Sequence, residues 1–190
     1  GVYVVDPGEA AVVRRFGIVV APRVDSGLHY RLPWPIDRVD VVNVSDVRRE
    51  TVGILMPEED HEHPEPPSKL QVLSGDTNVI DIEIVVQYQV RDPADFLLSV
   101  QYAPYLLVRD VARQAVTELL SRQPVDAILT TERQSLQEAI RTEMQQRLDW
   151  YSSGLAVAGI NLQKAFPPDE VANAFTDVNS AREDKARAIN

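Results

Sequence analysis

The chain contains no cysteine among its 190 residues, which excludes disulfide bonds and thiolate metal sites. The eight glycines are scattered singly, so a glycine-rich phosphate-binding loop is not predicted. No apolar run approaches the ~18–20 residues of a membrane-spanning helix. The formal net charge is −10 without a basic cluster. This argues against a nucleic-acid partner, because phosphate binding depends on lysine and arginine.

A recognisable catalytic set is also missing from the sequence. Nucleophilic catalysis needs a serine, threonine or cysteine with a base in reach, and no Gly-x-Ser-x-Gly elbow occurs. His29, in a Gly-Leu-His-Tyr setting, is typical of a hydrogen-bonded loop residue. Asp81 and Glu83 alternate onto one strand face, where acidic side chains usually serve solubility. We therefore predict no catalytic, cofactor or metal site; a hydrolase is the competing hypothesis.

The most informative stretch runs from Gly75 to Pro93. Even-numbered positions from Ile80 to Val90 are apolar, whereas most odd-numbered positions are polar. This period of two predicts one long strand of about 12 residues with one buried face. Asp92 and Pro93 end it, because proline lacks the N–H that a ladder needs and suits the first turn of a helix after an aspartate cap.

The residues before this strand are rich in β-branched side chains, which favour strands. We predict strands over residues 2–5, 10–16 and 18–20. A further strand-like stretch over 37–52 is either bulged or divided in two. Residues 23–30 are expected to form a loop.

Residues 31–36 read Arg-Leu-Pro-Trp-Pro-Ile and do not suit an interior strand, because each proline removes a hydrogen-bond donor. Trp34 stands between Pro33 and Pro35. Two interpretations are open. Either the indole covers the core, or it lies at a membrane interface, where tryptophan is enriched.

Residues 53–75 stand apart in composition. Within them, residues 57–67 hold four prolines, five acidic residues and two histidines without periodicity, which is typical of an exposed insertion. A metal site is the alternative, because His61 and His63 lie among carboxylates. However, a proline-rich loop offers no rigid scaffold, and the sequence has no third histidine nearby.

The second half of the chain predicts helices followed by a strand. Helices begin at Pro93 and Pro104, and another follows Thr131, whose spacing to Gln134 matches a capping box. This last helix carries four apolar side chains at i+4 spacing, and residues 155–166 return as a strand. One face of that strand is expected to comprise Ala156, Ala158, Ile160 and Leu162.

The two prolines after residue 166 end the strand and start a final helix. Phe175 and Val178 belong to its main apolar stripe. After Ala181 the residues are mostly charged, which favours a solvated helix or the start of a coiled coil.

Several motifs stand in order along the chain, at residues 6–9, 12–17, 26–29, 32–37, 73–78, 86–90, 127–130 and 166–171. Together they resemble those of the SPFH (Band 7, stomatin/prohibitin-like) family. Within the family, residues 86–93 and the Pro-Pro helix start most resemble the HflK branch, the membrane-bound modulators of the FtsH protease. The resemblance covers nearly the whole chain, and the insertion at about 57–70 departs from it.

The resemblance implies an α+β fold. It consists of a β-rich antiparallel first subdomain over 1–91 with the insertion 53–75, an α/β second subdomain over 92–167, and the start of a coiled-coil helix over 168–190. It further implies a non-enzymatic membrane scaffold. Copies assemble into rings or cages, alone or with an HflC-like paralogue, and regulate an FtsH-like membrane protease.

The resemblance also implies positions relative to the membrane and to other copies. One membrane-spanning segment would precede Gly1, in a bacterial inner membrane with the domain outside the cytoplasm. Pro33, Trp34 and Pro35 would lie next to the lipid bilayer. A stomatin-like organiser of lipid microdomains, or a channel regulator, is the alternative with the same fold. The expected oligomer interface comprises Asp81, Glu83, Gln87, Gln89, Phe175 and Val178.

Overall fold

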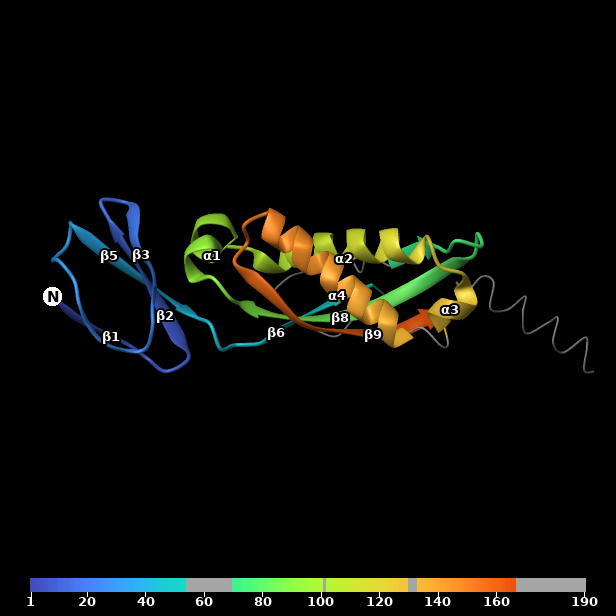
Figure 1. Cartoon of the computed structure of the whole chain (residues 1–190), viewed down its shortest axis with the longest axis horizontal. Coiled ribbons are helices and arrows are strands. Elements are labelled where there is room, and N and C mark those ends of the chain that lie inside the picture. Colours follow the sequence, from blue (N-terminus) through green and yellow to red (C-terminus); the bar gives the residue numbers. More distant parts are fainter. Residues whose placement is uncertain (54–69, 101, 130–132, 167–190) are drawn as a thin grey trace, which may run out of the picture.

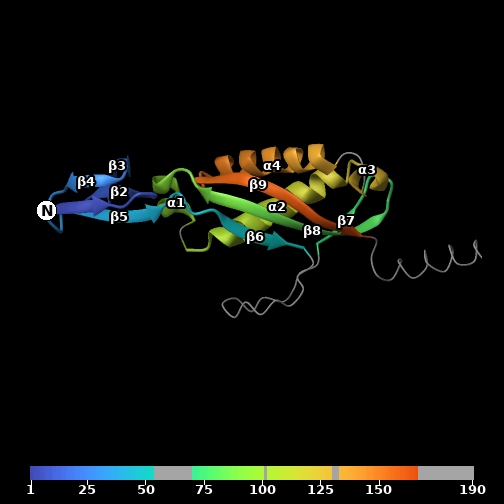
Figure 2. The same cartoon turned by 90° about the horizontal axis from the view of Figure 1, so that it is seen from below.

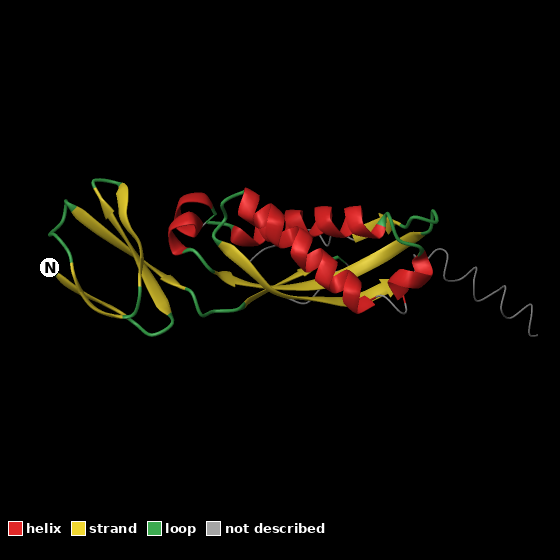
Figure 3. Cartoon of the chain, in the orientation of Figure 1, coloured by secondary structure: helices red, strands yellow, loops and turns green. Residues whose placement is uncertain are grey.

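The computed structural model describes residues 1–53, 70–100, 102–129 and 133–166. These residues form an elongated molecule, with a small unit of strands at the N-terminal end and a larger unit of sheet and helices beyond it (Figure 1). Every helix of the described residues lies in the larger unit (Figure 3). This mixture of antiparallel sheets and helices is the predicted α+β fold.

The N-terminal unit contains two small antiparallel sheets. β1 (Val2–Val5) pairs with β4 (Gly27–Tyr30), while β2 (Glu9–Arg15) lies between β3 (Ile18–Val24) and β5 (Asp37–Asn43). The expectation of a loop over residues 23–30 was therefore wrong. β4 forms because its residues pair directly with those of β1, and such a distant partner is not visible in the local pattern.

The C-terminal unit is organised around β8 (Val79–Val90), the predicted long strand. Along one edge β8 pairs with β9 (Leu155–Phe166), and along the other with β6 (Arg48–Val52) and β7 (Leu70–Leu73). β7 corrects the expectation of an exposed insertion over the whole of 53–75. Its Leu70 and Val72 are buried because they extend the apolar face of the sheet; residues 54–69 lie outside the described part.

Four helices belong to the C-terminal unit: α1 (Pro93–Ser99), α2 (Pro104–Leu120), α3 (Val125–Leu129) and α4 (Arg133–Trp150). α2 and α4 pack against the sheet and against each other (Figure 2). The predicted start of α1 is confirmed, because the Asp92 carboxylate accepts hydrogen bonds from the N–H groups of Ala94 and Asp95 at 3.0 and 3.1 Å. The proposed cap residue Thr131 lies outside the described residues.

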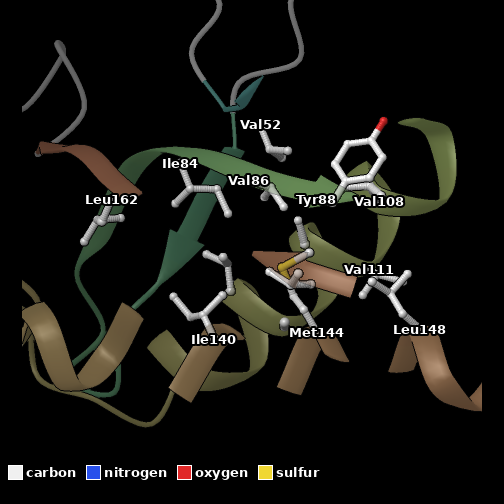
Figure 4. Close-up of a cluster of buried hydrophobic side chains, with 14 of the residues drawn as sticks. Val52, Ile84, Val86, Tyr88, Val108, Val111, Ile140, Met144, Leu148 and Leu162 are labelled. Carbon is white, nitrogen blue, oxygen red and sulfur yellow. The ribbon is translucent and has the colours of Figure 1, made fainter. Parts of the chain in front are cut away.

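The core lies between the apolar face of β8 and the two long helices. Ile84 and Val86 of β8 face Ile140 and Met144 of α4 (Figure 4). All even-numbered residues of β8 from position 80 are at most 3% exposed, and the apolar stripe of α4 is likewise buried. The alternation and the i+4 spacing therefore predicted both buried faces correctly.

The division between the two units differs from the expected boundary at residue 91. β6, β7 and β8 share a sheet with β9 and one continuous core with α2 and α4. The boundary between the two units therefore lies after β5, because β6 already belongs to the sheet whose apolar face α2 and α4 cover.

The expected face of β9 is correct at Ile160 and Leu162, which pack in or against the core, but wrong at Ala156 and Ala158. Register shifts in the β8–β9 ladder place Tyr88 opposite Val157 but Gln87 opposite Gly159, so Ala158 is an extra residue. Such a bulge reverses the alternation. Leu155 and Val157 are buried before the bulge, while Ala158 is exposed.

Candidate membrane-facing and assembly surfaces

The outer end of the N-terminal unit exposes large apolar side chains on two loops and at the start of β3. Phe16 and Gly17 form the β2–β3 turn with φ angles of 51° and 88°, and residues 31–36 connect β4 to β5. The N–H of Phe16 donates to the carbonyl oxygen of Ile36 at 3.0 Å, so the two loops lie side by side. We call Phe16, Ile18, Leu32 and Trp34 the apolar tip; they are 75%, 72%, 43% and 80% exposed.

This geometry excludes one of the two interpretations of Trp34. A side chain that is 80% exposed does not cover the core. Pro33 and Pro35 are exposed as well, and the Trp34–Pro35 peptide bond is cis. The three residues therefore lie together on the surface, and their contact with lipid stays a prediction.

Phe16 and Ile18 were not recognised as surface residues from the sequence. Bulky apolar residues on both sides of a turn glycine were the available signal, because solvent-exposed turns usually carry polar side chains. The proximity of this turn to Trp34 was not readable, since it depends on the pairing of β2 with β5.

Ion pairs surround the base of the apolar tip. Asp37 is buried, and its carboxylate accepts hydrogen bonds from Arg15 Nε at 2.8 Å and from the N–H of Leu32 at 2.9 Å. These bonds, the one from Arg15 foremost, hold the pKa of Asp37 below its usual value. Asp37 thereby fixes the loop that carries Trp34 to the end of β2.

Two further arginines bind a second aspartate, Asp40, on the same strand as Asp37. Arg14 Nε donates to the Asp40 carboxylate at 2.8 Å, and Arg38 Nε donates to it at 3.2 Å. Arg38 remains 73% exposed despite this bond. Arg31 Nη1 donates to the backbone carbonyl oxygen of Asp37 at 3.3 Å. We call Arg14, Arg15, Arg31 and Arg38 the arginine belt.

The predicted assembly face on β8 is only partly accessible. Asp81 and Glu83 are 3% and 8% exposed, so the expected solvent-exposed acidic face was wrong at these two positions. Both residues lie on the central strand, and Gln71 Nε2 donates to the Asp81 carboxylate at 2.9 Å. Gln87 and Gln89 are half-buried. Phe175 and Val178 lie outside the described residues.

His29 is held as a structural residue. Its Nε2 lies 2.8 Å from the carbonyl oxygen of Asp25, and its ring lies 5.6 Å from that of Tyr3. The structure does not describe His61 or His63. Within the described ranges, histidine and acidic side chains do not gather in a group of three that could hold a metal ion.

A buried polar network links β6, β8 and α2. Glu50 pairs with Arg109, whose guanidinium lies 5.4 Å from the ring centre of Tyr105. Burial, followed by the charge of Glu50, raises the pKa of Tyr88. The ion pair between Glu50 and Arg109 connects β6 to α2 and stabilises the junction of helix and sheet.

A hollow of about 210 Å³ lies where α2, α3 and α4 meet. It is smaller than the roughly 300–1,000 Å³ of most small-molecule sites, which also carry converging polar groups. Its lining is mostly apolar, with Leu119, Ala127, Ile128, Leu136 and Ala139 beside Gln123 and Ser135. None of these side chains is acidic, basic or histidine, so the hollow does not supply general acid–base chemistry.

Similarity to known proteins identifies the family of this chain. The model of the SPFH domain / Band 7 family matches residues 3–190. The chain belongs to the SPFH domain / Band 7 family. This SPFH domain is 31% identical over 191 residues to "Protein HflK" of Borreliella burgdorferi, covering 100% of the chain and 60% of that protein.

Two further relatives extend this comparison. The SPFH domain is 33% identical over 189 residues to "Protein HflK" of Vibrio parahaemolyticus, covering 100% of the chain and 42% of the relative. It is 31% identical over 189 residues to "Modulator of FtsH protease HflK" of Escherichia coli, covering 100% of the chain and 41% of the relative. The chain thus spans about half the length of these relatives, and the name of the third describes that protein as a modulator of the FtsH protease.

None of the helices in the described ranges of this SPFH domain combines the length and the apolar character that crossing a bilayer requires. The exposed apolar tip and the half-buried glutamines of β8 are its candidate surfaces for contact with a membrane and with neighbouring copies.

Proposed function

We propose that this SPFH domain is part of a non-enzymatic scaffold that regulates a membrane-bound, FtsH-type protease. The observation that carries the proposal is similarity along the whole chain to proteins named HflK, one of them named a modulator of the FtsH protease. The sequence supports a role without catalysis, because it has no cysteine and no nucleophile elbow beside a base.

The scaffold works by lateral assembly into rings or cages, either of identical copies or with an HflC-like paralogue. Many weak contacts add up in such an assembly. The partly accessible Gln87 and Gln89 on β8 are the best-supported contact residues in the described part. Asp81 and Glu83 are buried, so they would contribute to the contact only through their small exposed fraction. The role of Phe175 and Val178 in the contact rests on the sequence pattern.

The assembly is anchored to a bacterial inner membrane, with the SPFH domain on the non-cytoplasmic side and Pro33, Trp34 and Pro35 next to the bilayer. The exposed position of Trp34 supports this orientation, since tryptophan favours membrane interfaces. The spanning segment itself would lie in the part of the protein that precedes Gly1.

Affinity purification of the full-length protein from native membranes tests the proposed function. The FtsH-type protease is expected to co-purify, and cross-linking is expected to trap high-order oligomers. A Gln87→Arg/Gln89→Arg variant should weaken the oligomers, whereas Gln146→Arg on the exposed side of α4 should leave them unchanged. Recovery of only monomers without protease would refute the proposal.

The same purification examines the alternative, a stomatin-like organiser of lipid microdomains or a channel regulator. That role uses the same fold with another client, so oligomers would be recovered with a channel or lipid domain and without the protease.

A further inference from the structure

α1 lies between the two units of the molecule (Figure 1). It follows β8 of the C-terminal unit, yet it lies against β2 and β3 of the N-terminal unit. At its end, Ser99 Oγ donates to the carbonyl oxygen of Ser152 at 3.0 Å. At its start, the N–H of the cap residue Asp92 donates to the carbonyl oxygen of Gly154 at 3.0 Å. Both ends of α1 are therefore fixed to the turn between α4 and β9.

β2 is buried on both of its faces. Ala10, Ala11, Val12 and Val13 follow one another with exposed fractions of 0%, 0%, 1% and 8%. Successive side chains of a strand point to opposite faces, so each face of β2 is covered. β1 lies against β2 from within the N-terminal unit, and α1 lies against it from the C-terminal unit. An element of the larger unit thus completes the core of the smaller one.

Apolar contacts continue across the boundary between the units. Val42 of β5 is 6% exposed and belongs to the same buried cluster as Phe96 of α1. Val44, in the connection between β5 and β6, packs against this cluster. The guanidinium of Arg48, at the start of β6, lies 5.5 Å from the centre of the Phe96 ring. Phe96 therefore belongs to a core that residues of both units share.

A hydrogen bond joins the two units on the exposed side of this contact. Arg23 Nη1, on β3, donates to the carbonyl oxygen of Arg91 at 3.1 Å. Arg91 directly precedes the cap residue of α1, and Arg23 Nε is held by the Asp25 carboxylate at 2.9 Å. The N-terminal unit is thereby bonded to the start of α1 at a point outside the covalent connection.

We propose that α1 is a coupling element that makes the two units fold and reorient as one body. Domains joined by small polar interfaces usually move relative to each other, whereas this contact is apolar and shares a core. The packing of Phe96 and the Arg23 hydrogen bond oppose bending at residues 44–47, the covalent connection between β5 and β6. Packed interiors transmit strain, so an orientation imposed on one unit is carried to the other. The coupling does not depend on the proposed function.

The absence of cysteine from the sequence makes a direct test possible. Val12→Cys places one buried thiol in the N-terminal unit, and Val116→Cys places one in the C-terminal unit, at positions 1% and 0% exposed. Labelling of each thiol at increasing urea concentration reports the unfolding of its own unit. We expect the two midpoints to coincide, because coincident transitions from separate probes mark one cooperative unit.

Loss of the coupling should separate the two transitions. In a Phe96→Ala background, the midpoint from Val12→Cys should fall below that from Val116→Cys by about 1 M urea. The reason is that a unit as small as residues 1–43 has little core of its own. Leu136→Ala, in the buried stripe of α4, is the control and should lower both midpoints together.

Spin labels measure whether the units also reorient as one body. Labels at Ser26→Cys and Gln146→Cys, exposed positions of different units, should give one narrow distance distribution in double electron–electron resonance. Arg23→Gln should broaden it about twofold, since loosely joined domains move relative to each other. Arg122→Gln, at an exposed arginine of the other unit, should leave it unchanged. A Gln134→Cys/Gln146→Cys pair, about 18 Å apart along α4, should stay narrow in every variant.

Three results would overturn the inference. They are separate urea midpoints for the two thiols without a further substitution, a broad Ser26–Gln146 distribution in the chain with native Arg23, and coincident midpoints in the Phe96→Ala background. Circular dichroism establishes that each variant is folded, and Phe96→Leu replaces Phe96→Ala if the latter does not fold. If the units prove uncoupled but the full-length protein still co-purifies the protease, the proposed function stands independently.

Discussion

The carboxylate of Asp76 accepts a hydrogen bond from the backbone N–H of Val125 at 3.1 Å, which joins the β7–β8 turn to the start of α3. Ser74 Oγ donates to the same carboxylate at 2.5 Å. Beside them, the N–H of Gly75 donates to the carbonyl oxygen of Gln123 at 2.8 Å. The far end of the sheet is thereby attached to the helical layer.

This arrangement predicts a pH-dependent contribution of Asp76 to stability. The hydrogen bond from Ser74 is the main cause that lowers the pKa of Asp76 from 3.8. The stabilisation is therefore complete above the usual aspartate pKa and is lost as the pH falls through the lower pKa of the folded state. Asp76→Asn should melt below the wild-type protein at neutral pH, and the difference should shrink toward about pH 2.

Thermal melts of both proteins across this range measure the effect. Asp6→Asn, in the exposed β1–β2 turn, is the control and should show little difference at any pH. A gap between wild type and Asp76→Asn that does not vary with pH would contradict the role assigned to the charge.

The free edge of β9 depends on side chains of α4. Gln145 Nε2 donates to the carbonyl oxygen of Leu155 at 3.1 Å, and Gln145 Oε1 accepts from the N–H of Val157 at 2.8 Å. Gln137 Oε1 accepts from the N–H of Leu162 at 2.7 Å. Unpaired edge strands promote edge-to-edge association.

A Gln137→Ala/Gln145→Ala variant should therefore lose about 2–4 kcal/mol of stability, at about 1 kcal/mol for each hydrogen bond lost. It should also aggregate more readily, as light scattering would report. Gln146→Ala, on the exposed side of the same helix, is the matched control. Equal denaturation midpoints for the double variant and the control would show that the edge needs no such protection.

Gly154 occupies a position that excludes any side chain. It has a φ of 68°, and a Cβ atom would lie 2.2 Å from the carbonyl oxygen of Asp92. Its own carbonyl oxygen accepts from the N–H groups of Arg91 and Asp92. Gly154→Ala should cost more than about 2 kcal/mol in urea unfolding, because positive φ and a backbone clash combine.

Gly159 on β9 supplies the comparison for Gly154. A Cβ atom there would approach only the end of the Gln87 side chain, at 3.8 Å. Gly159→Ala should therefore be nearly neutral. If the two variants unfold at the same urea concentration, the close approach to Asp92 is not limiting.

Charge reversal at Asp81 should unfold the C-terminal unit rather than loosen an assembly. The residue is 3% exposed, and a lysine in its place would bury a charge beside Gln71. We expect Asp81→Lys to lose about 3–5 kcal/mol of stability. Gln87→Lys, at a half-buried position of the same strand, should keep the wild-type melting temperature. Circular dichroism separates these outcomes, and a fully stable Asp81→Lys variant would contradict them.

The sequence predicted those elements whose structure is decided by local pattern. β8 and α4 carry enough periodic apolar positions to define both the element and its buried face, and the Asp92 cap is a local hydrogen bond. The same local pattern failed at β4, which exists only through pairing with β1, and at the bulge in β9. Neither strand β4 nor the bulge in β9 has a local residue composition that distinguishes it from a loop or a regular strand.

The candidate surfaces were predictable to different degrees. Pro33, Trp34 and Pro35 were identified, but Phe16 joins them only because β2 and β5 are neighbours. For Asp81 and Glu83 the alternation gave the correct face of β8 but not its burial, since burial depends on strands paired along both edges. The alternation of polar and apolar residues predicts the face to which a side chain points. Whether that face is covered is determined by the complete sheet and what packs on it.

β6 and β7 follow one another along the same edge of β8. Val52 pairs with Ile84 and Leu70 pairs with Ile82, so the chain leaves the sheet and rejoins it two residues apart on the partner strand. The two strands are halves of a single interrupted strand. Whatever length of chain joins them, the register of the sheet is unchanged, and closing a longer connection costs little. Evolution can therefore lengthen or shorten this segment, and an experimenter can place a label there, without altering the fold.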